Sequence, residues 1–389
     1  MEQLWQGGPW ERPRHPVEPL VLPKIRPVKK RGNWIVFWIF LITILVLAAV
    51  AVWCSTDWGE SLPGRVPVQT CVPRAGVGGE ARLELENRAE QVLTAREIYD
   101  ACIAGVVYIQ AKDDSGRISS GSGVVMSSDG YIITNAHVIA GASCVRVVFR
   151  DNTALEAGLV GTQEDYDLAV LKVEANGLPT ARFCSSNHLQ VGDEVVAIGN
   201  PLGSTLRGTM TQGIVSAINR SVDLDGTTMS LVQTTAALNP GNSGGALIND
   251  RGQVVGITTM KMMSRYETIE GLGFAIPSRL VKGVVNQLIA TGEAKTPALG
   301  IMVAFDLAEY GGLKVLDVEE NSDAWAKGLR PSDVIVAVNG VPMTDDSILV
   351  SMKEELGVNE SLMLTVDRDG VRLDFEIVLM DAALFAEES

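Results

Sequence analysis

Positive charge, histidine and paired cysteine are all scarce in this chain. Its 389 residues carry a formal net charge of −15, and because nucleic acids are bound by basic faces, no nucleic-acid partner is expected. The five cysteines include no Cys-x-x-Cys pair, so no zinc site is expected. No other metal and no cofactor is expected either. Only His15, His137 and His188 are available as imidazole bases, which makes the search for a general base short.

Apolar residues make up 46% of the chain, and its length has room for two or three domains. Residues 104–276 show short apolar runs between clusters of Gly, Asn, Asp and Ser, a rhythm that predicts a β-barrel or β-sandwich. A helix at 277–290 and a short linker at 291–297 follow. The last ninety or so residues predict a mixed domain, with strands at 314–318, 334–338, 362–366 and 371–378 and a helix at 348–356.

The N-terminus predicts a membrane anchor. Residues 1–33 hold six prolines, seven Lys/Arg and three Glu, which indicates a disordered, basic tail. Residues 34–53 follow without a charge, and a helix of that length would be about 30 Å long, the thickness of a bilayer core. Since the basic residues precede this segment, the tail is expected in the cytoplasm and the rest outside. The alternative is a cleaved signal peptide, although its apolar region is usually only about 7–15 residues long.

Residues 54–97 are expected to hold a linker and an amphipathic helix. Residues 55–79 are rich in Pro, Gly and polar side chains, whereas an apolar stripe from Glu80 to about Cys102 predicts a helix. This helix would form either a stalk or a cover on the next domain. Cys71, Cys102, Cys144 and Cys184 would meet an oxidising compartment, where they form either disulfides or buried free thiols.

The sequence around Ser243 has the composition of a nucleophile turn. Residues 239–245 read Asn-Pro-Gly-Asn-Ser-Gly-Gly. Glycines permit the backbone angles that present a serine oxygen and turn N–H groups toward a developing oxyanion. The plainer interpretation is a surface turn, because Asn-Pro and Ser-Gly pairs are common in loops.

A base and a carboxylate lie upstream of this turn. His137 ends the apolar run 131–134 and would be held rigidly, whereas His188 lies in a polar loop and is expected to be solvated. Asp167 directly precedes the apolar run 168–173, so its carboxylate is expected to be partly buried and to need a hydrogen-bond donor. Asp165 lies among more polar residues. The alternatives are a structural core histidine and a turn-capping aspartate.

Three motifs resemble the HtrA family of trypsin-like serine proteases: Thr-Asn-Ala-His-Val at 134–138, Asp-Leu-Ala-Val-Leu-Lys-Val at 167–173, and Gly-Asn-Ser-Gly-Gly at 241–245. The resemblance covers about residues 98–383 and has the His, Asp, Ser order of the family. It implies a mainly β fold: a two-barrel, chymotrypsin-like protease domain over 98–292, followed by an α+β PDZ domain over 296–383. One anchor helix and one PDZ domain are most similar to the DegS type.

The resemblance implies a role for each site residue. His137 is the general base, Asp167 orients it and Ser243 is the nucleophile. The oxyanion hole is formed by Gly241 and Ser243, with Asn242 as a further donor. In the family, loops near the site control this hole; the matching residues here are 202–209, 221–228 and 261–271.

Four residues depart from the family pattern. Thr235 replaces a usual Asp, Ala246 a usual Pro, Leu202 a common aromatic and Ser332 a usual Gly. None removes a catalytic group. The specificity pocket would lie near 257–260 and 271–274, where small apolar residues favour an aliphatic side chain before the cleaved bond; the alternative is that these residues are only strand core.

The PDZ resemblance implies a peptide site. Leu299, Gly300, Ile301 and Met302 match the loop whose N–H groups capture a C-terminal carboxylate, while the peptide adds as a strand. The predicted protein is therefore a serine endopeptidase of the bacterial inner membrane, regulated by its PDZ domain, with its catalytic part periplasmic and unfolded or regulatory proteins as substrates. The family implies a homotrimer. The alternative function is a non-proteolytic, chaperone-like module that binds peptides through the PDZ domain.

Overall fold

The computed structural model describes residues 72–201, 206–224, 227–260, 271–304, 310–345 and 347–385. These residues belong to one compact unit that runs from Val68 to Ser389. The expected tail at 1–33 and the expected membrane helix at 34–53 lie outside the described residues. Among the helices that are described, none is long and apolar enough to cross a bilayer.

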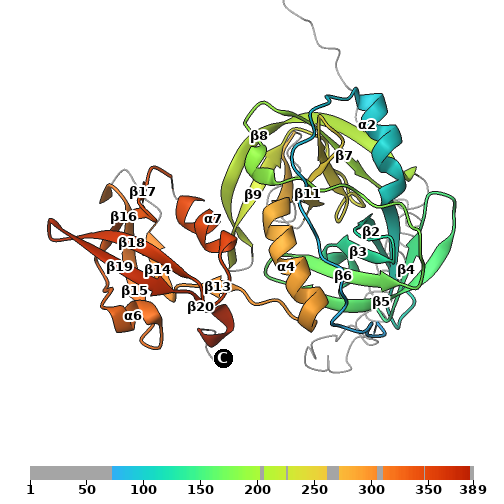
Figure 1. The fold of residues 1–389 in the computed structure, drawn as a ribbon. Helices are drawn as coiled ribbons and strands as arrows, with labels where there is room; N and C mark the ends of the chain where they lie inside the picture. Colours follow the sequence, from blue (N-terminus) through green and yellow to red (C-terminus); the bar gives the residue numbers. More distant parts are fainter. Residues whose placement is uncertain are drawn as a thin grey trace, which may run out of the picture. The chain divides into compact units, whose positions relative to one another are not determined.

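Two closed antiparallel barrels form the larger part of the fold (Figure 1). The strand order is β1-β2-β3-β6-β5-β4 in the first barrel and β10-β11-β12-β9-β8-β7 in the second. The first barrel comprises β1 (Val106–Lys112), β2 (Ile118–Val125), β3 (Tyr131–Thr134), β4 (Cys144–Val148), β5 (Ala154–Gln163) and β6 (Leu168–Val173). The second comprises β7 (Glu194–Gly199), β8 (Thr209–Leu224), β9 (Thr227–Thr234), β10 (Ala246–Asn249), β11 (Val254–Thr259) and β12 (Gly273–Pro277). The all-β prediction is confirmed, and a barrel is the correct choice over a sandwich.

Helix α4 (Ser278–Thr291) packs on the core that both barrels share. Its buried face carries Leu280, Val284 and Leu288, and it ends at Gly292, whose φ of 82° is left-handed. Glycine adopts this angle without strain, so the helix stops cleanly there. The helix predicted at 277–290 is thus confirmed.

The helix predicted from Glu80 to Cys102 is wrong over most of its length. Only α2 (Ala95–Cys102) is helical, and it begins at a Thr94–Glu97 capping box. Residues 72–93, here called the strap, are extended and bond to both barrels and to α4: Ala75 N–H donates to Leu159 O, Gly78 to Ile289 O and Leu93 to Asp250 O. These long-range bonds replace the bonds that a helix would have made.

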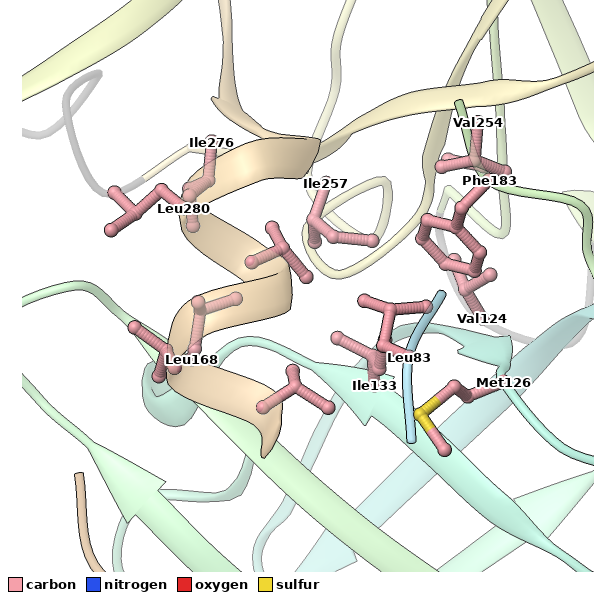
Figure 2. Close-up of a cluster of buried hydrophobic side chains, with 14 of the residues drawn as sticks. Leu83, Val124, Met126, Ile133, Leu168, Phe183, Val254, Ile257, Ile276 and Leu280 are labelled. Carbon is pink, nitrogen blue, oxygen red and sulfur yellow. The ribbon is translucent and has the colours of Figure 1, made fainter. Parts of the chain in front are cut away.

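The strap also contributes to the core. Figure 2 shows Leu83 among the side chains of the shared cluster, together with Ile133 of the first barrel and Leu280 of α4. Leu83 is buried. Its backbone N–H donates to Asn286 Oδ1 of α4 at 2.7 Å, and Asn286 Nδ2 donates back to Leu83 O at 3.3 Å. The apolar stripe therefore correctly indicated that this segment is buried on one side, although the segment is not a helix.

The last part of the chain is a small α+β domain with its own core. Its sheet has the order β14-β15-β16-β18-β19, with β17 on β16, and a separate β13–β20 pair. The strands are β13 (Pro297–Ala298), β14 (Ile301–Ala304), β15 (Leu313–Val318), β16 (Val334–Val338), β17 (Val341–Pro342), β18 (Ser361–Arg368), β19 (Val371–Val378) and β20 (Met380–Asp381); the helices are α6 (Asp323–Lys327) and α7 (Ser347–Glu355). Each strand and helix predicted here is present.

The described cysteines are not paired. Cys102, Cys144 and Cys184 are free thiols, so the disulfide alternative fails for pairs among these three. Cys102 donates to Gly252 O at 3.3 Å, and burial raises its pKa to about 11. Cys54 and Cys71 lie outside the described residues.

Candidate active site

His137 and Asp167 meet at one end of the first barrel. His137 lies in the short helix α3 (Ala136–Ile139), directly after β3. Its Nδ1 is 2.8 Å from Asp167 Oδ2 and 2.9 Å from Oδ1, and its backbone N–H donates to Asp167 Oδ1 at 3.1 Å. The Asp167 side chain is 1% exposed and that of His137 is 36% exposed. A buried carboxylate that accepts Nδ1–H leaves Nε2 free as a proton acceptor.

Asp167 is held by three further features. Its backbone has a φ of 53°, in the left-handed region, which an aspartate tolerates better than most residues. Its carbonyl accepts a bond from Asn135 Nδ2 at 2.8 Å, and its Oδ2 accepts one from Thr259 Oγ1 at 2.8 Å. Thr259 is buried at the end of β11 in the other barrel. The sequence did not indicate this contact.

The neighbouring candidates are placed elsewhere. Asp165 accepts a bond from Thr296 Oγ1 at 2.7 Å, beside the linker that leads to the smaller domain. His188 is exposed at the end of the 3₁₀ turn Ser186–His188. The structure therefore joins Asp167, and not Asp165, to His137.

Ser243 lies on a tight turn between β9 and β10 of the second barrel. Gly241 has a φ of 102° and Gly244 a φ of 80°, both left-handed angles that favour glycine. A Cβ at Gly244 would lie 2.2 Å from Ser122 O, so no larger residue fits there. Ser243 is 4% exposed, and its carbonyl accepts the Ser122 N–H at 2.8 Å.

The N–H groups of this turn differ in whether they have an acceptor. Among the described residues, no acceptor bonds to the N–H of Gly241 or of Ser243. The N–H of Asn242 is different, because it donates to Asn239 O at 2.9 Å. In this conformation Asn242 therefore does not supply the third donor that the resemblance implied.

Ser122 on β2 holds the turn around Ser243 through hydrogen bonds, a role that the sequence did not indicate. Its buried hydroxyl donates to Gly241 O at 2.7 Å and accepts the N–H of Asn200 at 2.8 Å. Asn200 follows β7, and its Nδ2 donates to Val107 O at 2.8 Å. This network joins strands of both barrels to the backbone beside Ser243.

His137 and Ser243 come from different barrels and are not bonded to each other within the described residues. No hydrogen bond joins Ser243 Oγ to His137 within the described residues. Bonds between catalytic groups are often long without substrate and shorten when it binds. No group of three or more His, Cys, Asp or Glu in the described ranges is placed to hold a metal ion.

Comparison with known proteins identifies this arrangement. Residues 121–257 match the trypsin-like peptidase domain family, and residues 297–379 match the PDZ domain family. The Serine protease Do-like HtrA of Lactobacillus helveticus is 39% identical over 282 residues, which cover 67% of this chain and 68% of that protein. The chain belongs to the HtrA family. It is a serine endopeptidase with a trypsin-like domain of two barrels and one PDZ domain.

Other HtrA proteins agree with this assignment. Putative serine protease HhoA of Synechocystis is 39% identical over 279 residues, 66% of this chain and 69% of that protein. Among solved structures, the HtrA-type protease AlgW with a tripeptide is 31% identical, has a TM-score of 0.63, and is matched over 74% of this chain and 97% of its own.

The departures from the HtrA pattern are accommodated locally. Thr235 Oγ1 accepts the N–H of Ile214 at 2.9 Å, Ala246 is buried in β10, and Ser332 takes the left-handed φ of 78° that a glycine would adopt freely. Leu202 lies outside the described residues, as do parts of the three expected control loops. In the expected specificity region, Ile257 is part of the shared core, so for this residue the strand-core interpretation is correct.

The PDZ domain has a groove beside its expected carboxylate loop. A cavity of about 910 Å³ is lined by Leu299–Val303 and by Leu349, Val350 and Lys353 of α7, and on its other side by protease and linker residues that include Gln163, Asp165 and Lys295. Gly300 has a φ of 66°, and a Cβ there would lie 2.6 Å from Ser322 Cβ. The loop therefore needs glycine at this position, and its backbone forms the wall of the groove.

Proposed function

We propose that this HtrA protease cleaves unfolded or regulatory proteins outside the cytoplasmic membrane and that C-terminal peptides bound to its PDZ domain regulate it. The observation that carries the catalytic part is the pairing of His137 with the buried Asp167, across the barrel boundary from Ser243. Ser243 Oγ attacks the scissile carbonyl. His137 Nε2 accepts its proton and later gives it to the leaving amine, while Asp167 holds the imidazole.

The oxyanion is stabilised by the N–H groups of Gly241 and Ser243, which have no acceptor among the described residues. Thr259 keeps the Asp167 carboxylate fixed through its hydroxyl. Because these donors and acceptors are already in place, little reorganisation is needed during the reaction.

Casein hydrolysis and labelling with an active-site phosphonate test the catalytic assignment. Ser243→Ala should lower kcat by several orders of magnitude, up to about a millionfold, and His137→Ala should be similarly severe. The double variant should be little worse, since the two residues act as a unit. Undiminished casein hydrolysis by Ser243→Ala, or phosphonate found on another residue, would falsify the assignment.

Regulation by peptides is supported by the cavity beside the loop Leu299–Met302, which PDZ and protease residues line together. The solved AlgW structures hold a tripeptide and a decapeptide, which makes peptides the first ligands to test here. Peptides that end in an apolar residue should raise cleavage of a separate reporter substrate, because a ligand activates when it binds the active state more tightly. A chain without residues 296–389 should not respond to peptide.

The membrane location rests on the basic tail and the uncharged segment 34–53. We place the N-terminus in the cytoplasm and the protease and PDZ domains in the periplasm of a bacterial cell, attached to the inner membrane. Alkaline phosphatase fused after residue 80 should be active, and the protein should resist carbonate extraction. Release of a soluble form that starts near Val52 would support signal cleavage instead.

The assembly is proposed to be a homotrimer, which light scattering in detergent tests directly.

A further inference from the structure

A small cavity of the protease domain carries positive charge in an otherwise acidic protein. It has a volume of about 130 Å³ and lies between α2, β1 and the residues that follow β7. Among the described residues that line it, the charged ones are Arg150 and Arg207, and none is acidic. This lining is opposite in sign to the whole chain, whose net charge is −15.

Neither arginine has a counter-ion. Arg150 is exposed, and its Cζ lies 5.9 Å from the centre of the Tyr99 ring. Arg207 is half-buried and donates to Phe149 O at 3.4 Å and to Asn152 Oδ1, which are both uncharged acceptors. Within the described residues, no ion pair involves either guanidinium. Both charges are therefore available to an anion in the cavity.

A tyrosine hydroxyl without a partner adds a third donor. Tyr108 of β1 lines the cavity and is only 5% exposed. Within the part of the chain that the structure describes, its hydroxyl forms no hydrogen bond. The neighbouring Tyr99 hydroxyl differs, since it donates to Gly208 O at 3.0 Å. A buried hydroxyl without a partner is unfavourable because it has lost contacts with water, and an acceptor inside the cavity would restore its hydrogen bond.

The nearby side-chain acceptors already have donors. Asn200 Oδ1, on the cavity wall, accepts the N–H of Gly208 at 3.0 Å. Asp151 accepts the N–H of Thr153 at 2.9 Å and does not line the cavity. Asp100 of α2 pairs with an arginine of the same helix at 3.9 Å. These groups therefore do not neutralise the two arginines of the cavity.

Size and charge indicate which anion fits. A cavity of about 130 Å³ has the volume of about four water molecules, so it suits a small ion and is too small for a nucleotide. Two guanidinium groups favour a doubly charged ligand over a single carboxylate, and their donors match the oxygens of phosphate. A phosphate group carries about −1.5 to −2 charges at neutral pH.

We propose that this cavity binds a single phosphate group through the guanidinium groups of Arg150 and Arg207 and the hydroxyl of Tyr108. The phosphate oxygens accept hydrogen bonds from all three side chains, and no covalent bond forms or breaks. The site is separate from those already described: the cavity shares no lining residue with the cavity beside the PDZ loop, and none of the three residues proposed as catalytic lines it. The inference is therefore independent of the proposed function.

Calorimetric titration of the full-length chain with sodium phosphate, in detergent and a phosphate-free buffer, tests the inference. The parent chain should bind one phosphate with a Kd of about 1 mM or below, whereas sodium chloride at equal ionic strength should give no saturable binding. Arg150→Gln and Arg207→Gln should each weaken phosphate binding at least about tenfold, and Tyr108→Phe about three- to tenfold. A parallel titration with glycerol 3-phosphate distinguishes a free phosphate ion from an esterified one.

Two variants serve as controls. Arg146→Gln removes an equal charge from an exposed site on β4 that does not line the cavity, and should leave the phosphate affinity unchanged. Arg150→Lys keeps the charge but loses the paired donors of the guanidinium, so it should bind phosphate more tightly than Arg150→Gln. Because Arg150 is exposed, its variants should fold like the parent chain, which urea unfolding checks.

The outcomes decide for or against the site. A parent chain that binds no phosphate, or cavity variants that bind it unchanged, overturn the inference. Equal weakening by Arg146→Gln also overturns it, because binding then depends only on net charge. If acetate binds as tightly as phosphate, the assignment to phosphate is wrong. A loss confined to the cavity variants supports the site, whether free or esterified phosphate binds more tightly. None of these results bears on casein hydrolysis, so the proposed function stands or fails separately.

Discussion

At the residue scale, the backbone beside Ser243 depends on one buried hydroxyl, that of Ser122. Ser122 Oγ donates to Gly241 O, and the Asn200 N–H donates to the same hydroxyl oxygen. Gly241 also supplies one of the two proposed oxyanion donors. Without the hydroxyl, Gly241 O loses its donor and Asn200 N–H loses its acceptor in a buried site, which costs about 1–3 kcal/mol for each group.

We therefore expect Ser122→Ala to lower kcat by about 10- to 100-fold with little change in KM, because the oxyanion donors act mainly in the transition state. Steady-state hydrolysis of a peptide reporter measures both constants. Ser143→Ala is the control, since its hydroxyl donates to Lys112 O away from the site. A normal kcat in Ser122→Ala would show that the turn holds its shape without this bond.

Ser332 bears a conformational cost that a glycine would avoid. Its φ is 78°, and its N–H donates to Val315 O at 2.8 Å, so the turn is fixed by the sheet. A left-handed conformation costs a residue with a Cβ about 1–2 kcal/mol, part of which the entropy of glycine offsets. Ser332→Gly should stabilise the PDZ domain by up to about 1 kcal/mol in urea unfolding. Asn359→Gly, at a φ of 73°, should change less because asparagine tolerates this region.

The three residues proposed as catalytic stand out in the sequence because each lies in a short local pattern. His137 ends an apolar strand, Asp167 precedes another, and Ser243 is surrounded by glycines. Their supporting partners could not be predicted, since each contact joins distant parts of the chain. Thr259 is 92 residues from Asp167, and Ser122 is 119 residues from Gly241. A threonine or serine within a strand carries no local sign of such a partner.

At the element scale, the strap shows how tertiary contacts override a periodic pattern. Leu85, Ala89 and Leu93 have helical spacing, yet this segment is extended. Its N–H groups find acceptors on both barrels and α4, and Gln253 Oε1 accepts the N–H of Ala89 at 2.9 Å. A periodic apolar pattern indicates that one side of a segment is buried, but it carries no information about acceptors that are distant in the sequence. The strands were easier to predict, because short apolar runs bounded by turn residues suit few other structures.

The strap should therefore contribute to protease stability, and Leu83 tests this. Its side chain is buried in the core shared by both barrels and α4 (Figure 2). Leu83→Ala should destabilise the protease domain by about 2–5 kcal/mol, as expected for a buried leucine. Val92→Ala, whose side chain is 60% exposed, should change the stability by less than about 0.5 kcal/mol. Urea unfolding followed by backbone circular dichroism measures the stability of both variants. Equal effects would mean that the strap is not part of the folded core.

At the scale of the whole molecule, α7 joins the PDZ domain to the protease. Ser230 N–H on β9 donates to Glu354 Oε1 at 2.8 Å. Arg279 of α4 donates to Ser351 O at 3.1 Å and pairs with Glu355 at 2.8 Å. Lys353 of the same helix lines the cavity beside the loop Leu299–Met302. If peptides bind in this cavity as proposed, α7 would connect the bound peptide to the second barrel.

We expect Glu354 to make this contact dependent on pH. Burial raises its pKa from 4.5 to about 7, against the lowering effects of the Ser230 N–H, Lys353 and Arg279; Glu355 raises it further. Asp165 and Tyr166 lie in the same region: the charge of Asp165 acts on Lys353, and burial together with the charges of Glu354 and Asp165 raises the pKa of Tyr166. When the domains separate, Glu354 regains its ordinary pKa. The docked state therefore holds a proton that the separated state releases between about pH 4.5 and 7.

The direction of the pH dependence of docking follows from this difference in bound protons. Docking is strongest below pH 4.5 and weakens as the pH rises to about 7, by a total of about 3 kcal/mol at most. Glu354→Gln keeps an acceptor for the Ser230 N–H but cannot ionise, so docking in this variant should lose most of its pH dependence and be tighter at pH 8. Amide hydrogen exchange at Ser230, corrected for the intrinsic rate at each pH, measures the opening of this contact. Parallel pH profiles in the parent and the glutamine variant would show that Glu354 does not control the contact, and that the domains separate for another reason.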